Sequence, residues 1–255
     1  MRTTAIMNLK GGTAKTVTAI NAAAIMAEDY GLRVLLVDAD SQANLTEFIS
    51  RAPEYGICAG GFADLLRGLK PFPMPTKVEN VRLLAGDETL MALDVTAAGS
   101  GAADPMALAE WLKAHEEDYD RVLIDCPPAF SAGAMAALIA ADDVVIPMKL
   151  DAFGIRGMAN LIEQIRNMKA VNPDLELAGV LPTMVYPGEQ QREALEQLTG
   201  KLTAAGIRTF HRIRRSPSVD GSTFSQAPLV QHSPKCGACR DYRIFVRELE
   251  EMEVG

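Results

Sequence analysis

A glycine-containing turn between a predicted strand and a predicted helix constrains this chain more than any other feature. The turn reads Lys10-Gly11-Gly12-Thr13-Ala14-Lys15-Thr16. Residues 3–8 before it are mostly apolar and residues 17–30 after it are rich in alanine, which favours a buried strand followed by a helix. In that geometry several backbone N–H groups and the positive end of a helix point at one place, which suits a phosphate. We therefore predict a phosphate-binding loop.

The residues of this loop have separate expected roles. Lys15 would reach the β- and γ-phosphates of a nucleotide, and the hydroxyl of Thr16 would hold Mg²⁺. An ordinary phosphate loop gives no task to the front lysine, Lys10. The alternative is a strand–helix turn without a ligand. The predicted nucleotide-binding residues are Lys10, Gly11, Gly12, Thr13, Ala14, Lys15, Thr16 and Val17.

The spacing of the two lysines resembles the deviant Walker A motif, Lys-Gly-Gly-x-x-Lys-Ser/Thr, of the ParA/MinD ATPases. The resemblance implies that ATP is the cofactor and that Lys10 crosses a dimer interface to touch the partner subunit's nucleotide. Lys10 and Lys15 are therefore predicted to take part in catalysis. The chain departs from the family at Ala14, where glycine is usual. A Cβ beside the phosphates is expected to weaken binding or shift the loop, which leaves open a module that binds but no longer hydrolyses.

A second motif, Asp38-Ala39-Asp40-Ser41-Gln42-Ala43-Asn44, follows the next predicted strand. Alternation along a strand predicts that Asp38 and Asp40 point the same way, into the crevice at the carboxyl end of the sheet. The stretch resembles the family's Asp-x-Asp-Pro-Gln-Gly-Asn, with Ser41 and Ala43 as departures. The resemblance implies that Asp40 orients the attacking water and that Asp38 helps to hold Mg²⁺. Alternatively, the two carboxylates cap and turn the chain ahead of a helix.

A third motif, Arg121-Val122-Leu123-Ile124-Asp125-Cys126-Pro127-Pro128, has the Walker B arrangement of a hydrophobic strand that ends in aspartate. There Asp125 would contact Mg²⁺. The Asp-Cys-Pro-Pro ending resembles the ParA pattern. Farther along, residues 179–184 resemble the family's late strand, and this resemblance places the adenine beside Thr183 and Met184.

Hydrophobic runs alternate with helical stretches through the rest of the chain, which predicts βαβ units around a parallel sheet. We predict an α/β fold with a single doubly wound, mostly parallel sheet flanked by helices, and one ParA-type ATPase domain over residues 1–255. Residues 51–77 break the alternation and are expected to form a rim insertion with a short helix at 62–69. Strands are expected at 33–38, 81–85, 121–125, 143–148 and 177–183, and helices at 106–117, 132–141, 154–171, 189–205 and about 238–252.

Composition narrows the classes of function. No run of about 18 apolar residues is present, so no membrane span is expected. The formal net charge of −8 argues against a uniformly basic nucleic-acid binder. Any contact with DNA must therefore come from a local patch.

One basic window stands out in this acidic chain, because residues 197–219 contain no Asp or Glu. Clustered arginines near a loop suit phosphate contacts, which carry no sequence information. ParA-type proteins bind DNA non-specifically around the equivalent strand and loop. The alternative is an ordinary solvated charged face. The predicted DNA-binding residues are Arg208, Arg212, Arg214 and Arg215.

Four cysteines, Cys58, Cys126, Cys236 and Cys239, do not suggest a disulfide framework in a chain of 255 residues. Cys236 and Cys239 have the C-x-x-C spacing of a metal or redox pair. Two cysteines cannot close a four-ligand site in a monomer. Some relatives bridge a dimer with an iron–sulfur cluster, but an incidental pair is the first expectation.

Together these features predict a slow DNA-partition ATPase that requires ATP and Mg²⁺ and is cytoplasmic and nucleoid-associated. By resemblance, ATP closes a homodimer that binds DNA non-specifically, and a ParB-like centromere-binding or adaptor protein stimulates hydrolysis. Plasmid, integrative element and chromosome remain open as cargo. A MinD-like membrane-positioning ATPase is one alternative, although the acidic residues 247–253 suit anionic lipid poorly. A metabolic enzyme or metal-cluster carrier is another.

Overall fold

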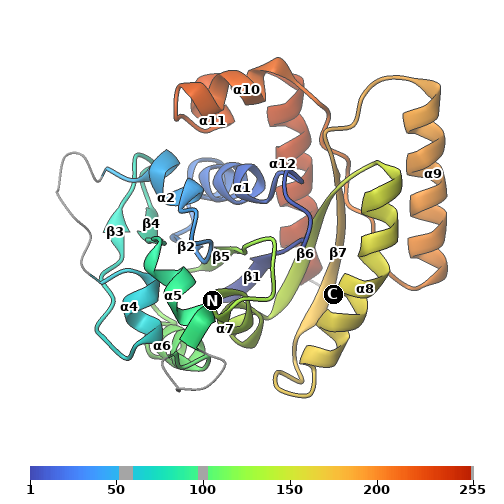
Figure 1. Ribbon diagram of the computed structural model, residues 1–255. Helices are drawn as coiled ribbons and strands as arrows, with labels where there is room; N and C mark the ends of the chain where they lie inside the picture. The colour runs from blue at the N-terminus through green and yellow to red at the C-terminus, as the bar shows by residue number, and fades with distance from the viewer. Residues whose placement is uncertain (52–59, 97–102, 254–255) are drawn as a thin grey trace.

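A seven-stranded sheet forms the centre of the computed structural model, which describes residues 1–51, 60–96 and 103–253 (Figure 1). The strand order is β3-β4-β2-β5-β1-β6-β7. Strand β3 runs antiparallel to β4, and every other neighbouring pair is parallel. The strands are β1 (Arg2–Ile6), β2 (Val34–Asp38), β3 (Met74–Pro75), β4 (Val81–Leu84), β5 (Arg121–Asp125), β6 (Asp143–Lys149) and β7 (Glu176–Thr183).

Helices cover both faces of this sheet (Figure 1). One layer contains α1 (Lys15–Tyr30), α2 (Asn44–Ile49), α10 (Pro217–Phe224), α11 (Leu229–His232) and α12 (Gly237–Glu250), which continues into a short 3₁₀ turn, Glu251–Glu253. The other contains α4 (Phe62–Leu66), α5 (Thr89–Thr96), α6 (Ala107–Ala114), α7 (Ala132–Ala140), α8 (Ala152–Met168) and α9 (Glu189–Ala204).

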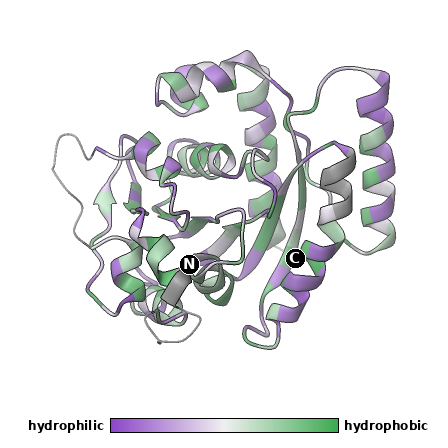
Figure 2. Cartoon of the chain, in the orientation of Figure 1, coloured by the Kyte–Doolittle hydropathy of each residue, from purple (hydrophilic) through white to green (hydrophobic). Residues whose placement is uncertain are grey.

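The central strands are buried on both sides. In β2, Val34 and Leu36 pack into the cluster under α1 and α12, whereas Leu35 and Val37 pack into the cluster on the opposite face. Strands covered on both faces read as continuous apolar runs, which is why the sequence reveals them. In Figure 2 hydrophobic residues gather on the inner strands and helices, and hydrophilic residues line the outer helix α9.

The predicted doubly wound parallel fold is confirmed, and the expected strands and long helices lie within about three residues of the observed ends. The helix predicted at 62–69 is shorter, because the chain leaves the helix at Gly68, whose φ is +77°. The predicted rim insertion also contains β3, and residues 52–59 within it lie outside the described part of the chain.

Among the described residues, three helices were not expected from the sequence: α5, α10 and α11. Helix α10 contains a glycine and three serines or threonines in eight residues, and α11 has only four residues. Weak helix formers and short length leave little periodic signal. These helices therefore depend on packing against the rest of the molecule.

Candidate nucleotide site

A cleft of about 550 Å³ opens beside the carboxyl ends of β1, β2 and β5. This is the edge at which open α/β sheets bind ligands. Expected residues that line it are Gly11, Gly12, Thr13, Ala14, Lys15, Thr16, Val17, Asp40 and Met184. Gln42, Asn44 and Pro128 of the second and third motifs line it too. Residues that the sequence analysis missed are Ile20, Glu47, Phe48, Thr223 and Gln226.

The start of α1 is arranged as an anion site. Ala14, the residue before the helix, caps no N–H group with its side chain, so the N–H groups of the first turn remain for a ligand. Its φ of 69° and ψ of 30° lie in the left-handed region, which costs a residue with a Cβ about 1–2 kcal/mol. Glycine would adopt this conformation without that cost. The structure thus locates strain at the position where the chain departs from the family motif.

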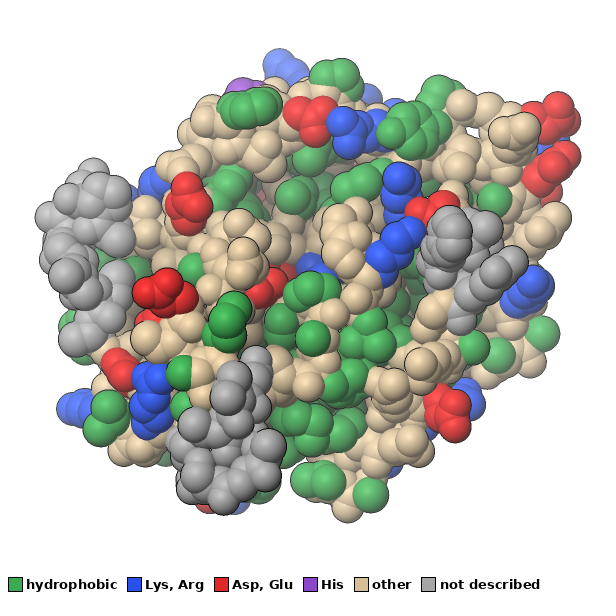
Figure 3. Space-filling view, in the orientation of Figure 1, with side chains coloured by type: hydrophobic (Ala, Val, Ile, Leu, Met, Phe, Trp, Pro, Cys, Tyr) green, Lys and Arg blue, Asp and Glu red, His purple; other side chains and the backbone are tan. Residues whose placement is uncertain are grey.

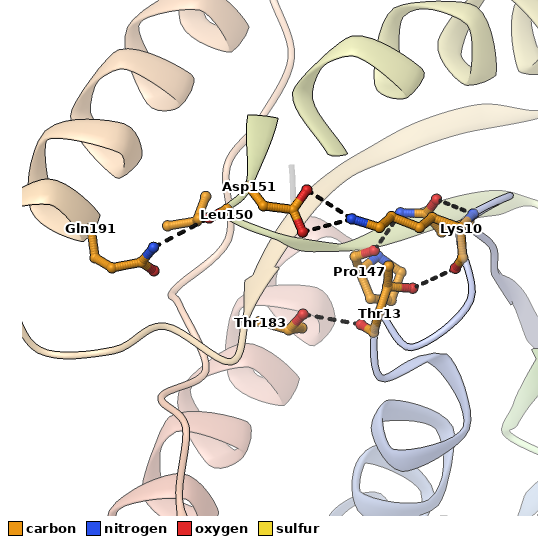
Figure 4. Close-up of polar contacts among 8 residues, drawn as sticks. Lys10, Thr13, Pro147, Leu150, Asp151, Thr183 and Gln191 are labelled. Atoms are coloured by element: carbon orange, nitrogen blue, oxygen red, sulfur yellow. Dashed lines mark hydrogen bonds and ion pairs between the residues drawn. The ribbon is translucent and has the colours of Figure 1, made fainter. Parts of the chain in front are cut away.

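Hydrogen bonds from three strand ends hold the phosphate loop (Figure 4). Asn8, just after β1, donates from Nδ2 to the carbonyl of Pro147 at 2.7 Å, and its Oδ1 accepts from the N–H of Lys10 at 2.9 Å. Thr183, at the end of β7, donates to the carbonyl of Thr13 at 3.0 Å. Thr183 is fully buried, so its hydroxyl supports the loop. The loop is therefore positioned by β6 and β7 before any ligand arrives.

The front lysine lies against its own chain (Figure 4). Nζ of Lys10 is 2.7 Å and 2.6 Å from the two carboxylate oxygens of Asp151, which follows β6. Both side chains are about one-third exposed. The adjacent carbonyl of Leu150 accepts from Gln191 of α9 at 3.2 Å. In this conformation the ammonium group of Lys10 is bound by a carboxylate of its own chain.

The predicted metal ligands Thr16 and Asp125 meet. The Thr16 hydroxyl donates to Oδ2 of Asp125 at 2.6 Å. Asp125 is buried, and its Oδ1 has no hydrogen-bond partner among the described residues. Burial, with a contribution from the nearby Asp38 carboxylate, raises the pKa of Asp125. A buried carboxylate oxygen without a donor and an adjacent hydroxyl fit the oxygen coordination that Mg²⁺ prefers.

Lys15 lies beside the same carboxylate in a buried position. Burial lowers the pKa of its ammonium group, while the charge of Asp125 acts in the opposite direction. Its Nζ reaches the carbonyl of Lys10 at 3.5 Å, a long contact. Lys15 makes no ion pair with a carboxylate among the described residues. The arrangement suits a cation whose main partner is a bound phosphate.

The two carboxylates at the end of β2 differ in burial, and the expectation that they point the same way stays a prediction. Asp38 ends the strand fully buried, and its Oδ2 accepts from the N–H and the hydroxyl of Thr46 at 2.9 Å and 2.8 Å. Its Oδ1 accepts from the N–H of Asp40 at 3.3 Å. Of the two, Asp40 lines the cleft, and the chain turns just after it, at residues 41–42. Asp38 lies near the Asp125 carboxylate, and its predicted role in holding Mg²⁺ stays a prediction.

A smaller cavity of about 110 Å³ adjoins the cleft, and Met184 lines both. Its other walls include Val17, Thr183 and Tyr242. Thr183 and Met184, beside which the base is predicted, both line this cavity, and that placement stays a prediction. On the cleft side the wall is completed by Thr223 of α10, which the sequence analysis missed. The signal that could have found α10 is Ser216-Pro217, since serine caps the helix and proline occupies its first turn.

The basic window supplies less free charge than its sequence suggests. Nε and Nη2 of Arg214 bind the carboxylate of Asp241 at 2.7 Å and 2.8 Å, and Arg215 pairs with Asp220 at 2.7 Å. Arg208 lies over the ring of Phe210, 5.2 Å from its centroid. Arg208 and Arg212 are exposed and have no ion pair among the described residues. The four arginines thus differ in their partners, and their predicted contact with DNA stays a prediction.

The surface view shows how charge is distributed on one face of the molecule. In Figure 3 basic side chains on the visible face stand next to acidic ones rather than forming one continuous basic area. Arg214 acts first as a structural partner of α12, because the carboxylate side chain of Asp241 is 2% exposed.

The C-terminal helix packs inward. Its apolar residues Tyr242, Phe245, Val246 and Leu249 are buried in the cluster shared with α1. Within residues 1–51, 60–96 and 103–253, no helix has the length and apolar character needed to cross a bilayer. The apolar face that a MinD-like membrane helix would need is thus occupied by the core.

The cysteines do not build a metal site in the described part of the chain, where no group of three or more metal-ligating side chains occurs. Cys126 is buried after β5. Cys236 and Cys239 lie at the start of α12. Cys58 lies outside the described residues.

Known proteins match this chain over nearly its whole length. The family model described as an AAA domain matches residues 1–177. The chromosome-partitioning ATPase Soj of Thermus thermophilus is 34% identical over 253 residues, which cover 98% of this chain and 95% of that protein.

Two solved structures share the fold. Apo McdA from Cyanothece has a TM-score of 0.84 at 23% identity and covers 98% of this chain and 99% of its own. Cobyrinic acid a,c-diamide synthase from Mycobacterium smegmatis, with bound ADP and magnesium, has a TM-score of 0.82 at 27% identity over 100% of this chain and 96% of its own.

The matched residues include the complete phosphate loop, the buried Asp125 and the strands that carry them. The sequence match to Soj extends across both layers of helices. The chain belongs to the ParA/MinD family of P-loop ATPases.

Proposed function

We propose that this protein is a DNA-partition ATPase that works as an ATP-operated switch. ATP closes a homodimer, the dimer holds non-specific DNA, and a ParB-like centromere-binding or adaptor protein stimulates the hydrolysis that releases it. In this proposal residues 1–255 act as one ATPase domain in the cytoplasm, on the nucleoid. The observation that carries the proposal is the second lysine, Lys10, which directly precedes the loop residues that line the cleft, in a chain that is 34% identical to a chromosome-partitioning ATPase.

Different residues of the cleft bind the phosphates, the base and Mg²⁺. Lys15 and the N–H groups at the start of α1 bind the β- and γ-phosphates of ATP, with Met184 beside the base. Thr16 and Asp125 hold Mg²⁺, which neutralises charge on the phosphates when it is bound.

Asp40 orients the attacking water at the γ-phosphate. It is the carboxylate after β2 that lines the cleft, and its N–H is fixed by Asp38. Asp38 is in turn fixed by Thr46, whose hydroxyl also accepts from the N–H of Gly86 after β4 at 3.0 Å. In this proposal Asp38 and Thr46 are positioning residues, which keep the turn that carries Asp40 in place.

Dimerisation requires Lys10 to exchange partners. The lysine must leave Asp151 before it can reach a nucleotide held by the second subunit. A phosphate of that nucleotide replaces the carboxylate of Asp151, so Lys10 keeps a charge-assisted hydrogen bond in both states. ATP therefore makes a contact with Lys10 in the dimer that is absent in the monomer. A ligand shifts an equilibrium between two states only through such a difference in contacts.

DNA binding draws on the arginines that carry no ion pair. Arg208 and Arg212 are exposed and contact backbone phosphates, with Arg215 available after it leaves Asp220. A dimer carries two such patches on one body, and the second engages at a high effective concentration. This couples ATP to DNA residence without a new contact in each subunit.

The test measures phosphate release with and without DNA, together with gel-shift titrations in ATP, ADP and no nucleotide. Asp40→Ala should bind ATP, accumulate as dimer and lose hydrolysis. Lys10→Ala should bind ATP and fail to dimerise. Equal DNA affinity in all three nucleotide states would remove the switch, and no DNA binding in any state would favour a metabolic role for the same cleft.

The matched pair Thr46→Val and Thr46→Ser tests the positioning of Asp40. Valine removes the hydroxyl that reaches Asp38, so kcat should fall while KM changes little. Serine keeps the hydroxyl and should restore most of kcat. A KM increase with unchanged kcat in Thr46→Val would contradict the positioning role.

A further inference from the structure

Cys236 and Cys239, at the start of α12, have no role in the proposed ATPase cycle. Cys236 is the cap residue of the helix, and its Sγ accepts a hydrogen bond from the N–H of Cys239 at 3.3 Å. Cys236 is partly exposed, whereas Cys239 is fully buried one turn farther on. One thiol is therefore open to solvent, and the second lies behind it on the same turn.

Positive charge surrounds the exposed thiol. The guanidinium group of Arg214 lies against Gly237, so closely that a Cβ there would be 2.7 Å from Nη1. Lys235 and Arg240 flank the pair on the exposed surface.

The acidic groups near the pair are already engaged. Asp241 binds Arg214, and Asp29 binds Arg243 at 2.6 Å. Glu28, which also lies near Cys239, accepts from Gln231 at 2.7 Å.

The other described thiols are less suited to react first. Burial raises the pKa of the Cys126 thiol strongly, and the Asp125 carboxylate adds to the effect. Burial also raises the pKa of Cys239. Cys236 is the accessible attacking thiol, and Cys239 is placed to resolve what forms on it.

We propose that Cys236 and Cys239 are a reversible thiol–disulfide site. The Cys236 thiolate attacks a low-molecular-weight disulfide, its S–S bond breaks, and one small thiol leaves after taking up a proton. Cys239 then attacks Cys236 Sγ in the mixed disulfide, loses its proton, and displaces the second small thiol. Two protein thiols are oxidised to one disulfide, and one small disulfide is reduced to two thiols.

The helix turn needs little movement to close this bond. Residues three apart on a helix have Cβ atoms about 5–6 Å apart, and a disulfide requires about 3.5–4.5 Å. The Cys236 backbone is extended, with φ −68° and ψ 158°, so it can adjust without unwinding α12. Closure shifts Gly237 beneath Arg214, whose guanidinium binds Asp241 and whose side chain lines the cavity next to Met184.

The test uses the full chain with Cys58→Ser, so that the thiol outside the described residues does not contribute. The protein is incubated with oxidised glutathione, alkylated, digested and analysed by mass spectrometry. A disulfide that joins Cys236 to Cys239 is expected, with Cys126 alkylated. Added Cys239→Ser should accumulate glutathione on Cys236, and added Cys236→Ser should react little at Cys239.

Alkylation rates of the reduced protein provide a check that does not depend on the Cys236 and Cys239 substitutions. The alkylation rate of Cys236 should exceed that of Cys126 by about tenfold or more. Equal rates for the two thiols would overturn the proposal. So would glutathione that fails to accumulate on Cys236 in Cys239→Ser, or a linked peptide that fails to form. None of these outcomes bears on ATP or DNA binding, so this inference and the proposed function fail separately.

Discussion

The phosphate loop and the basic loop between α9 and α10 (residues 205–216) both contain several cations, which differ in their partners. In the phosphate loop Lys15 is buried and has no carboxylate partner among the described residues, while hydrogen bonds from Asn8 and Thr183 hold the backbone. In the basic loop Arg214 and Arg215 are exposed yet already paired. A cation without a partner in a rigid site is prepared for a ligand, whereas a cation with an ion pair must first give it up.

The largest expected effect comes from Lys15→Ala. It removes the unpaired buried cation, and ATP affinity should fall by about a hundredfold or more, since a charge-assisted hydrogen bond is lost in a desolvated site. Calorimetric titration with ATP measures the effect. The exposed Lys169→Ala is the control. ATP binding of wild-type strength in Lys15→Ala would refute the phosphate-loop assignment.

Arg214→Ala should reduce stability more than any other substitution in the basic loop. It leaves the buried carboxylate of Asp241 with fewer donors, at a cost of about 1–3 kcal/mol in the free energy of unfolding. Arg212→Ala should stay within about 0.5 kcal/mol of wild type. Urea unfolding midpoints compare the two variants. Equal midpoints would show that Arg214 is not a structural residue.

The unpaired arginines should dominate DNA affinity. Arg208→Ala and Arg212→Ala should each flatten the log–log dependence of affinity on salt by about 0.9 per lost phosphate contact, for every duplex sequence alike. Gel shifts with ATP at several salt concentrations measure these slopes, with the exposed Arg166→Ala on α8 as control. An unchanged slope in both variants would place the DNA surface elsewhere.

The smallest expected effect follows from Asp151→Asn, which weakens the ion pair between Lys10 and Asp151 of the same chain. Partly exposed ion pairs contribute about 0–1 kcal/mol, so ATP-dependent dimerisation should strengthen by no more than about fivefold. Sedimentation with a non-hydrolysable ATP analogue measures it, with Lys10→Ala as the non-dimerising reference. Weaker dimerisation in Asp151→Asn would mean that the carboxylate supports the dimer instead of restraining Lys10.

Much of the fold and the centre of the site could be predicted from sequence because they depend on local spacing. Strands buried on both faces appear as apolar runs, and the phosphate loop joins one such strand to a helix within a few residues. Asp125 ends its strand, so the sheet edge at which it acts follows from the strand itself. Even the strain at Ala14 could be foreseen, because glycine is the residue that the loop conformation permits freely.

What only the tertiary structure decided concerns partners that are distant in the chain. Asp38 is buried and accepts hydrogen bonds from Thr46, whereas Asp40 lines the cleft, a difference in burial that strand alternation does not anticipate. Arg214 is bound by Asp241 across 27 residues, and Lys10 by Asp151 across 141. Composition and spacing determine which charges this protein has. Which of them are free is set by long-range packing, because a charge is available only where the folded chain provides no opposite charge to meet it.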